Sequence, residues 1–317
     1  MNRSLGLVYL FCPLSTVLLL GACSAKPAPD STRTADTNTT QTAGATQPLA
    51  TISKFSGSES LVFDPARDVY FVSNVNGNPA VKDGNGFIAR ITADGVVDSL
   101  HFIQGGRNGV TLNAPMGSRM QGDTLWVLDV DALRGFNAVT GAPVAAIDLS
   151  PVHPLFLNDV TLGPDGDFYI TDTGVGKTHT GPDRIYHVDR NRRVTIALES
   201  SALSMPDGIG WDANGRRLIL APFGGTAVQS WQPGQAAPTN LAPGPSKFDG
   251  VEIQPDGQIL ITSWNDSSVS TLEGDKLVRR LKLAIPPADV SMDTKRKRVG
   301  VVSMMTDQFQ LWAWPQR

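Results

Sequence analysis

An all-β domain is the fold that the sequence favours, for two reasons. Short runs in which apolar and polar residues alternate recur along the chain, as in DVYFVSN (68–74), RRLILAP (216–222) and QILITSW (258–264). This period of two is typical of strands that bury one face. Apolar residues at helical spacing are scarce, whereas glycine is abundant, with 31 residues. We therefore expect strands joined by tight turns, and few helices.

A repeated segment divides this domain into six units. Each copy reads as a strand, a tight turn at a sequence such as PDG, and a second strand, and the copies are aligned without gaps. The copies begin at Glu59, Ala114, Asn158, Asp207, Asp249 and Ala288. Their spacing of about 40 to 55 residues leaves room for two more strands in each unit, which is typical of a β-propeller blade. We predict a six-bladed β-propeller with four-stranded antiparallel blades.

The two ends of this domain are expected to share a blade. PLATISKFSG (48–57) precedes the first copy and FQLWAW (309–314) follows the last, and both read as strands. Pairing them would close the ring and protect an otherwise open sheet edge. The domain would then extend over residues 49–317.

The first 22 residues have the pattern of a signal peptide. Arg3 is their only charge, and the apolar run at 5–20 is too short to span a bilayer comfortably. The following LGAC (20–23) resembles a bacterial lipobox, which implies cleavage before Cys23 and lipidation of its sulfur. An ordinary secretory signal cut near Ala22 is the alternative. No disulfide is expected in the mature chain, because Cys12 lies in the removed segment.

Residues 23–48 are expected to be a disordered tether between the lipid and the propeller. They are rich in Thr, Ala, Ser, Pro, Gln and Asp and contain hardly any bulky apolar residue. We therefore expect a lipoprotein of the cell envelope that faces the periplasm. Ser24, in place of the Asp that is read as an inner-membrane retention signal, favours the outer membrane.

Charge excludes one class of partner. The net charge is -3, and the basic cluster KRKR (295–298) lies between two strand-like runs, where a solvated turn is expected. A nucleic-acid surface needs clustered Lys and Arg, so no nucleic-acid partner is expected.

We expect a monomer that touches the membrane only through its lipid anchor.

Four polar residues at the start of the repeats point to a metal site. First strands line the channel of a propeller, so Glu59, Asn158, Asp207 and Asp249 should converge at one mouth of it. Three carboxylates facing each other would repel unless a cation lay between them. An all-oxygen ligand set favours Ca²⁺, with Mg²⁺ and Mn²⁺ as alternatives and Zn²⁺ or copper less suited. The shell of Ca²⁺ would need water or substrate to complete it.

These repeats resemble a known family. ESLVFDP, LNDVTLGPDG, MPDGIGWD and FDGVEIQPDG are similar to the SMP-30/gluconolactonase/luciferin-regenerating-enzyme family of six-bladed propellers, which includes regucalcin, over residues 50–317. The resemblance implies metal ligation by Glu59, Asp207 and Asp249, with Asn158 at the metal or touching the substrate. It also implies a metal-dependent hydrolase of a small lactone or ester.

Two positions depart from the family pattern. Asp207 stands where the family usually has Asn, which adds negative charge. Phe156 stands where sugar-lactone hydrolases of the family often have Arg, which makes a less polar substrate easier to accommodate.

Candidate catalytic and substrate-binding residues follow from this interpretation. Asp249 is the first candidate for the base that removes a proton from water, and Asp159 is the second; a turn or capping role is the alternative for Asp159. Connections between second and third strands, at 74–86, 172–184, 222–226 and 264–268, should form the rim. Candidate substrate contacts are Asn158, Phe156, Arg107, Asn113, His179, Asn74 and Trp264.

Two other functions remain open from the sequence. A propeller that binds a cell-envelope ligand or partner could use the cation only for structure, and closure of the mouth by the loops at 74–86 and 172–184 would indicate it. A metal-free propeller similar to strictosidine synthase is the third possibility, and the number of channel carboxylates argues against it.

Overall fold

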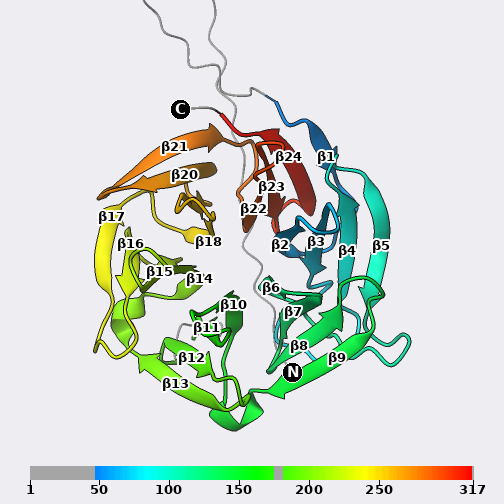
Figure 1. Ribbon diagram of the computed structural model, residues 1–317, viewed down its shortest axis with the longest axis horizontal. Helices are drawn as coiled ribbons and strands as arrows, with labels where there is room; N and C mark the ends of the chain where they lie inside the picture. Colours follow the sequence, from blue (N-terminus) through cyan, green and yellow to red (C-terminus); the bar gives the residue numbers. More distant parts are fainter. Residues whose placement is uncertain (1–46, 175–180, 316–317) are drawn as a thin grey trace, which may run out of the picture. The chain divides into compact units, whose positions relative to one another are not determined.

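The computed structural model describes residues 47–174 and 181–315, which form six four-stranded antiparallel sheets arranged as blades around a central axis (Figure 1). This confirms the predicted six-bladed propeller. In the described ranges the helical segments are two short 3-10 turns, η1 (Ser150–Val152) and η2 (Ser201–Leu203). None of the described helical segments is long and apolar enough to span a membrane.

The blades follow one another in chain order. Blade 1 contains β2 (Ser58–Asp64), β3 (Val69–Asn74), β4 (Phe87–Thr92) and β5 (Val97–Gln104). Blade 2 contains β6 (Ser118–Gln121), β7 (Thr124–Asp129), β8 (Ala132–Asn137) and β9 (Pro143–Asp148). Blade 3 contains β10 (Leu157–Leu162), β11 (Phe168–Asp172), β12 (Arg184–Val188) and β13 (Val194–Glu199). Blade 4 contains β14 (Pro206–Asp212), β15 (Arg217–Pro222), β16 (Ala227–Trp231) and β17 (Thr239–Pro243). Blade 5 contains β18 (Phe248–Ile253), β19 (Ile259–Ser263), β20 (Ser268–Glu273) and β21 (Lys276–Lys282).

Blade 6 is built from both ends of the domain. It contains β22 (Val290–Asp293), β23 (Arg298–Ser303), β24 (Gln308–Ala313) and, on its outer edge, β1 (Ala50–Ile52). β1 pairs antiparallel with β24, with Ala50 opposite Leu311 and Ile52 opposite Phe309. The expected closure of the ring by its two terminal strands is therefore present.

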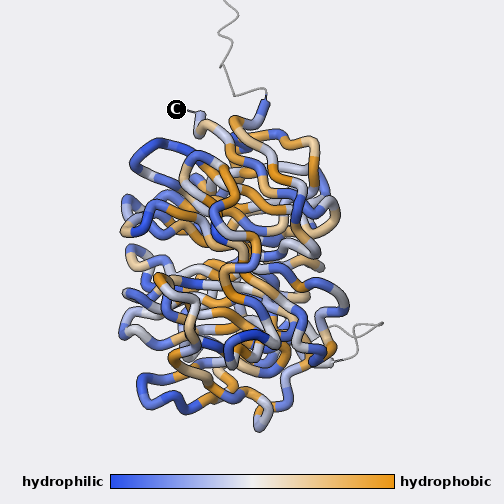
Figure 2. Tube along the Cα trace, turned by 90° about the vertical axis from the view of Figure 1, so that its right-hand side faces the viewer, coloured by the Kyte–Doolittle hydropathy of each residue, from blue (hydrophilic) through white to orange (hydrophobic). Residues whose placement is uncertain are grey.

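The core lies between neighbouring blades. Leu61 and Tyr70 of blade 1 pack in one apolar cluster with Val302 and Phe309 of blade 6, and the rings of Tyr70 and Phe309 are 5.5 Å apart. Figure 2 shows hydrophobic segments mainly in the interior and hydrophilic segments in many of the loops at the edges. Apolar burial between blades stabilises the ring without a disulfide.

Four inner strands carry a β-bulge near their start. The register shifts at Ser58/Leu61, Leu157/Val160, Pro206/Gly208 and Phe248/Val251. Each bulge therefore spans one of the predicted ligands, and a bulge re-aims the side chain that it carries. In blade 3 the freed N–H of Asp159 donates to Thr171 Oγ1 (2.9 Å), and that hydroxyl donates to the Asp207 carbonyl in blade 4 (2.7 Å).

The glycine after Asp207 is required by close packing of two inner strands. A Cβ at Gly208 would lie 2.0 Å from the carbonyl oxygen of Asp249 in the next blade. Only glycine fits there, which explains the DG pair at the start of β14.

The structure corrects the repeat alignment in blade 2. The N–H of Met116 donates to the Leu128 carbonyl, as the N–H of Ala288 donates to the Val302 carbonyl. Met116, and not Ala114, therefore occupies the position equivalent to Ala288. The turn between β6 and β7 is shorter than the turn at 254–258 in blade 5, so an alignment without gaps slips along β6.

Candidate metal and substrate site

Three carboxylates from three blades meet at one mouth of the channel. Glu59, Asp207 and Asp249 begin the inner strands of blades 1, 4 and 5, and one carboxylate oxygen from each lies within 4.8 Å of the others. Each residue is buried, with an exposed fraction of 5 to 7%. The sequence predicted this convergence from the repeat. Three buried like charges at this distance need protons or a cation between them.

Burial and mutual repulsion raise the pKa of every member of this cluster. Burial is the largest cause for Glu59, and the charges of Asp249 and Asp207 add to it. Burial likewise raises the pKa of Asp207, followed by the charges of Asp159 and Asp289. The pKa of Asp249 rises through burial and then through the charge of Asp207. Without a cation, the cluster therefore retains protons at pH values where exposed carboxyl groups are ionised.

Asn158 adds an oxygen to the same site. Its Nδ2 donates to Thr173 Oγ1 (3.0 Å), and Thr173 in turn donates to the Pro206 carbonyl (2.9 Å). This fixes the amide so that Asn158 Oδ1 is the atom left over, and it has no hydrogen-bond partner among the described residues. The same holds for Glu59 Oε2. Buried oxygens without a donor, next to clustered carboxylates, fit a hard divalent cation.

A cavity of about 220 Å³ lies over the cluster. Its polar lining residues are Glu59, Asn158, Thr173, Asp207 and Asp249. Its apolar lining residues are Met116, Phe156, Met205, Phe223, Trp264, Ala288 and Met304. The site thus combines a small floor of acidic side chains with predominantly apolar walls.

Four of the lining residues occupy the same place in different blades. Thr173, Phe223, Trp264 and Met304 each follow directly after the second strand of their blade. The rings of Phe223 and Trp264 meet edge to face at 5.3 Å. The structure therefore places the first residues of these connections at the ligand end of the channel, where the sequence analysis expected the connections. Two candidate substrate contacts belong to these connections. Trp264 lines the pocket, whereas His179 lies outside the described residues. Cys23, the predicted lipidation site, also lies outside them.

Asp159 is corrected from candidate base to structural residue. Its Oδ1 accepts the N–H of Val160 (2.7 Å), and its Oδ2 accepts the N–H of Ile209 in the next blade (3.0 Å). In addition, Arg119 Nη2 lies 3.7 Å from Asp159 Oδ2. Asp159 is absent from the described lining of the pocket. Because Oδ1 caps its own strand and Oδ2 accepts from the next blade, the capping role that the sequence left open describes it better.

Three other candidate contacts are also placed away from the substrate cavity. Arg107 is exposed and is not part of the described pocket lining. Asn113 is buried, where its Nδ2 donates to Asp129 (2.8 Å) and its Oδ1 accepts the N–H of Gly84 (3.1 Å). Asn74 accepts from the Ser56 backbone and donates to its own strand. The two asparagines are buried and shape loops, and neither belongs to the described lining of the cavity.

Asp172, which sequence reasoning missed, positions a pocket wall. It ends β11, and its Oδ1 accepts the N–H of Phe156 (2.7 Å). Its Oδ2 accepts the N–H of Leu155 (3.0 Å) and the hydroxyl of Tyr186 (2.8 Å). Asp129, which ends β7, plays a similar role: its Oδ1 accepts the N–H of Ala114, two residues before Met116. An Asp or Asn at the end of the second strand was the signal that could have revealed this role.

Arg119 was also missed, although an arginine in an inner strand is unusual. It is partly buried, its Nε donates to the Val160 carbonyl (3.0 Å), and its Nη1 lies 3.3 Å from Glu252. Asp159 and Asp289 contribute charge to the same layer of the channel. This cationic group lies below the carboxylate cluster and partly balances the acidic channel.

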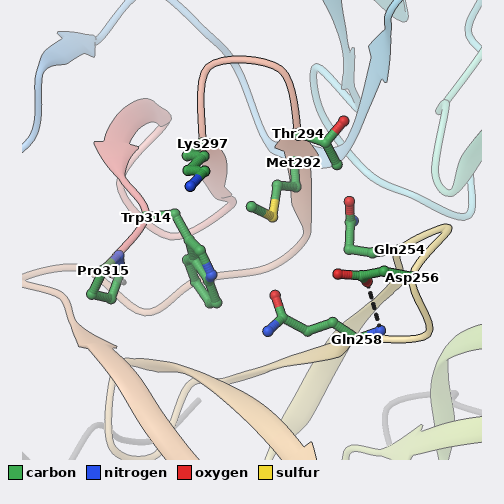
Figure 3. Close-up of a pocket in the computed structure, with 8 residues that line it drawn as sticks. All are labelled: Gln254, Asp256, Gln258, Met292, Thr294, Lys297, Trp314 and Pro315. Atoms are coloured by element: carbon green, nitrogen blue, oxygen red, sulfur yellow. Dashed lines mark hydrogen bonds between the residues drawn. The ribbon is translucent and has the colours of Figure 1, made fainter. Parts of the chain in front are cut away.

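A second pocket lies at the opposite ends of the inner strands (Figure 3). Its volume is about 340 Å³, and it is lined by the turns at 254–258 and 294–297 together with Met292, Trp314 and Pro315. Asp256 is the only acidic residue in its described lining. The grouped oxygen donors found over the channel mouth are missing from that lining, so the first pocket is the candidate active site.

Known structures share this fold. A gluconolactonase from Xanthomonas campestris has a TM-score of 0.63 and 15% identity, covering 84% of this chain and 89% of its own. Regucalcin from Agrobacterium tumefaciens, a calcium-binding protein, has a TM-score of 0.63 and 17% identity, covering 86% and 96%. Virginiamycin B lyase from Staphylococcus aureus has a TM-score of 0.57 and 12% identity, covering 83% and 98%. At these identities the likeness concerns the fold.

Sequence comparison identifies the family. No curated protein is a match to this sequence. The family model described as the SMP-30/Gluconolactonase/LRE-like region matches residues 119–292, which is more than half of the chain. The chain therefore belongs to the SMP-30/gluconolactonase/LRE-like family.

Proposed function

We propose that the protein is a divalent-metal-dependent hydrolase that opens a small lactone or related ester over the carboxylate cluster. One observation carries the proposal: three buried carboxylates within 4.8 Å of one another form the floor of a substrate-sized pocket. The family membership supports it, and one of the similar structures is a gluconolactonase. A purely structural ion would not require a pocket above it.

Glu59, Asp207 and Asp249 would hold the cation, with Asn158 Oδ1 as a fourth oxygen. We propose Ca²⁺, because its shell of about six to eight oxygens leaves positions for water and substrate. Regucalcin, which is similar in fold, is a calcium-binding protein. When bound, such an ion would polarise the substrate carbonyl and stabilise the oxyanion that develops.

The chain itself supplies orientation and proton transfer. The apolar walls orient the substrate and exclude bulk water, which strengthens electrostatic interactions in the pocket. Ligation needs only one oxygen of each carboxylate, so Asp249 retains a second oxygen that can accept a proton. In the reaction, the oxygen of water bonds to the carbonyl carbon and the acyl carbon–oxygen bond breaks. Asp249 takes a proton from water and returns it to the leaving oxygen, which gives a hydroxy acid.

We further propose that this reaction takes place at the cell envelope. The lipobox-like LGAC (20–23) supports anchoring through Cys23, and residues 23–48 have the composition of a flexible tether. A substrate would then be met outside the cytoplasm, and the outer membrane is the membrane that we favour.

Hydrolysis by the purified protein tests the function. After chelation, the protein receives Ca²⁺, Mg²⁺, Mn²⁺ or Zn²⁺ separately, and acid release from a panel of lactones and esters is followed at constant pH. We expect metal-dependent turnover that Asp249→Asn abolishes and that Asp275→Asn, an exposed turn carboxylate, leaves unchanged. One bound cation per chain without turnover of any substrate would refute the hydrolase and favour a binding propeller with a structural ion.

A further inference from the structure

We propose that the substrates are small apolar lactones or esters, aromatic or alkyl, and not the polyhydroxylated lactones of sugar acids. This inference rests on the proposed hydrolase function and concerns the same pocket. It follows from the chemistry of the walls, from the few polar groups that are free, and from the size of the cavity.

The walls present sulfur and aromatic surface. Three methionines and three aromatic residues account for most of the apolar lining, and they come from blades 2 to 6. They are Met116, Met205, Met304, Phe156, Phe223 and Trp264. Thioethers pack favourably against aromatic rings and adapt to different shapes. Such walls suit a ring or an alkyl chain, and they offer nothing to a row of hydroxyl groups.

Few polar groups in the described pocket lining can donate a hydrogen bond to a substrate. The hydroxyl of Thr173 accepts from Asn158 and donates to the Pro206 carbonyl. Among the fully buried polar atoms of the described lining, those without a close hydrogen-bond partner are Asn158 Oδ1, Glu59 Oε2 and the indole nitrogen of Trp264, and this indole faces the Asp249 carboxylate. The two oxygens belong to the proposed cation site, so the Trp264 indole N–H beside Asp249 is the one fully buried donor in the described lining that a substrate oxygen could reach. One carbonyl or ester oxygen can be satisfied there.

Beyond the second carboxylate oxygens of Asp207 and Asp249, which can accept a hydroxyl close to the cluster, further hydroxyl groups would lose their hydrogen bonds to water without replacement. The described lining includes no Arg, Lys, His, Gln or Ser, so beyond the carboxylates and the amide of the proposed cation site it offers few partners to sugar hydroxyls. Each unsatisfied hydroxyl should weaken transition-state binding roughly tenfold. A sugar lactone, which carries several hydroxyls, would be disfavoured by orders of magnitude.

The volume sets the size of the substrate. A cavity of about 150 Å³ can hold benzene, and this one measures about 220 Å³. A substrate of roughly 10 non-hydrogen atoms would fill it, which corresponds to an aryl-fused lactone, an aryl acetate or a lactone with a short alkyl chain.

Matched substrates test this specificity on the Ca²⁺-loaded full-length protein in detergent. Dihydrocoumarin and an alkyl δ-lactone represent the apolar class, and glucono-δ-lactone represents the sugar class with the same ring ester. We expect kcat/KM for the apolar substrates to exceed that for the sugar lactone at least about a hundredfold. Equal or faster hydrolysis of the sugar lactone overturns the substrate class and leaves the hydrolase intact. No turnover of either class, with any ion, overturns the hydrolase and the substrate class with it.

Adjacent methionines provide a matched pair of variants. Met304 lines the pocket, whereas its neighbour Met305 is 66% exposed. Met304→Gln should lower kcat/KM for dihydrocoumarin about tenfold, mainly through KM, because the amide replaces apolar contact surface. Met305→Gln should leave it unchanged. If the two variants behave alike, the pocket wall does not contact the substrate, and the inference is wrong.

Discussion

The carboxylate cluster should make the metal-free protein unstable in a way that one substitution relieves. Asp249→Asn keeps the shape of the side chain and removes one of three mutually repelling charges. We therefore predict that, in chelator, this variant is more stable than the parent protein. The opposite ranking would be expected if Asp249 were an ordinary buried polar residue whose replacement disturbs its surroundings.

The size of the effect follows from the geometry. Two unit charges 4.8 Å apart repel by about 3.5 kcal/mol at an effective dielectric constant of about 20. Protonating an aspartate at pH 7 costs about 4 kcal/mol, from its ordinary pKa of about 3.9. With three carboxyl groups, the state of lowest free energy at pH 7 holds one proton. It lies roughly 7 kcal/mol above three ionised groups that do not interact. With two carboxyl groups this free-energy penalty falls to about 3.5 kcal/mol. The free energy of unfolding of the variant should therefore be about 4 kcal/mol higher than that of the parent.

The sign of the pH dependence is also fixed. The pKa values of these carboxyl groups are higher in the folded than in the unfolded protein. The parent protein therefore loses stability as the pH rises above about 4 toward the folded pKa values. The advantage of Asp249→Asn should be small near pH 4 and should increase toward pH 7.

Thermal unfolding in chelator measures this difference. A gain of about 4 kcal/mol corresponds to a rise in Tm of roughly 10 °C for a domain of this size. Added Ca²⁺ should raise the Tm of the parent protein and not that of the variant. Asp275→Asn, which removes an exposed charge, should change Tm little. A chelated Asp249→Asn protein that melts at or below the parent temperature at pH 7 would show that the buried carboxylates do not repel, and would refute the argument for a cation.

Further predictions concern the proton balance, the neighbouring acids and the anchor. Affinity for Ca²⁺ should rise with pH, because the clustered carboxyl groups have raised pKa values and must release protons; calorimetry in two buffers counts the protons, and equal affinity at pH 6 and 8 would contradict this. Asp159→Ala removes the acceptor of the Ile209 N–H and should lower the free energy of unfolding by about 3 kcal/mol while the folded protein keeps its turnover; lost turnover at full stability would restore Asp159 as the base. Asp172→Ala should raise KM more than it lowers kcat, since it releases the Phe156 backbone; an effect on kcat alone would argue against a positioning role. Cys23→Ser should stop incorporation of labelled palmitate, and a variant that still incorporates the label would rule out Cys23 as the lipidated residue.

The parts of this molecule that sequence could predict are those written in a repeated pattern. Strand alternation and the repeat predicted the blades, and the register of the repeat placed Glu59, Asp207 and Asp249 together. Both predictions depend only on spacing along an inner strand. The same reasoning failed in blade 2, where a shorter turn moves Met116 into the position assigned to Ala114. A spacing argument cannot detect a change in turn length that leaves no mark in hydrophobic alternation.

The character of the pocket depends on residues outside the repeated strand pattern. Phe223 and Met304 project from the ends of second strands, and Phe156 is held by Asp172 from the neighbouring strand. Their identities vary from blade to blade, because no shared backbone requirement constrains them. In contrast, the sequence allowed Asp159 two roles, a base beside a ligand or a turn or capping residue. Its two backbone hydrogen bonds, one of them to the next blade, show that composition alone does not separate an acid that meets substrate from one that joins two blades.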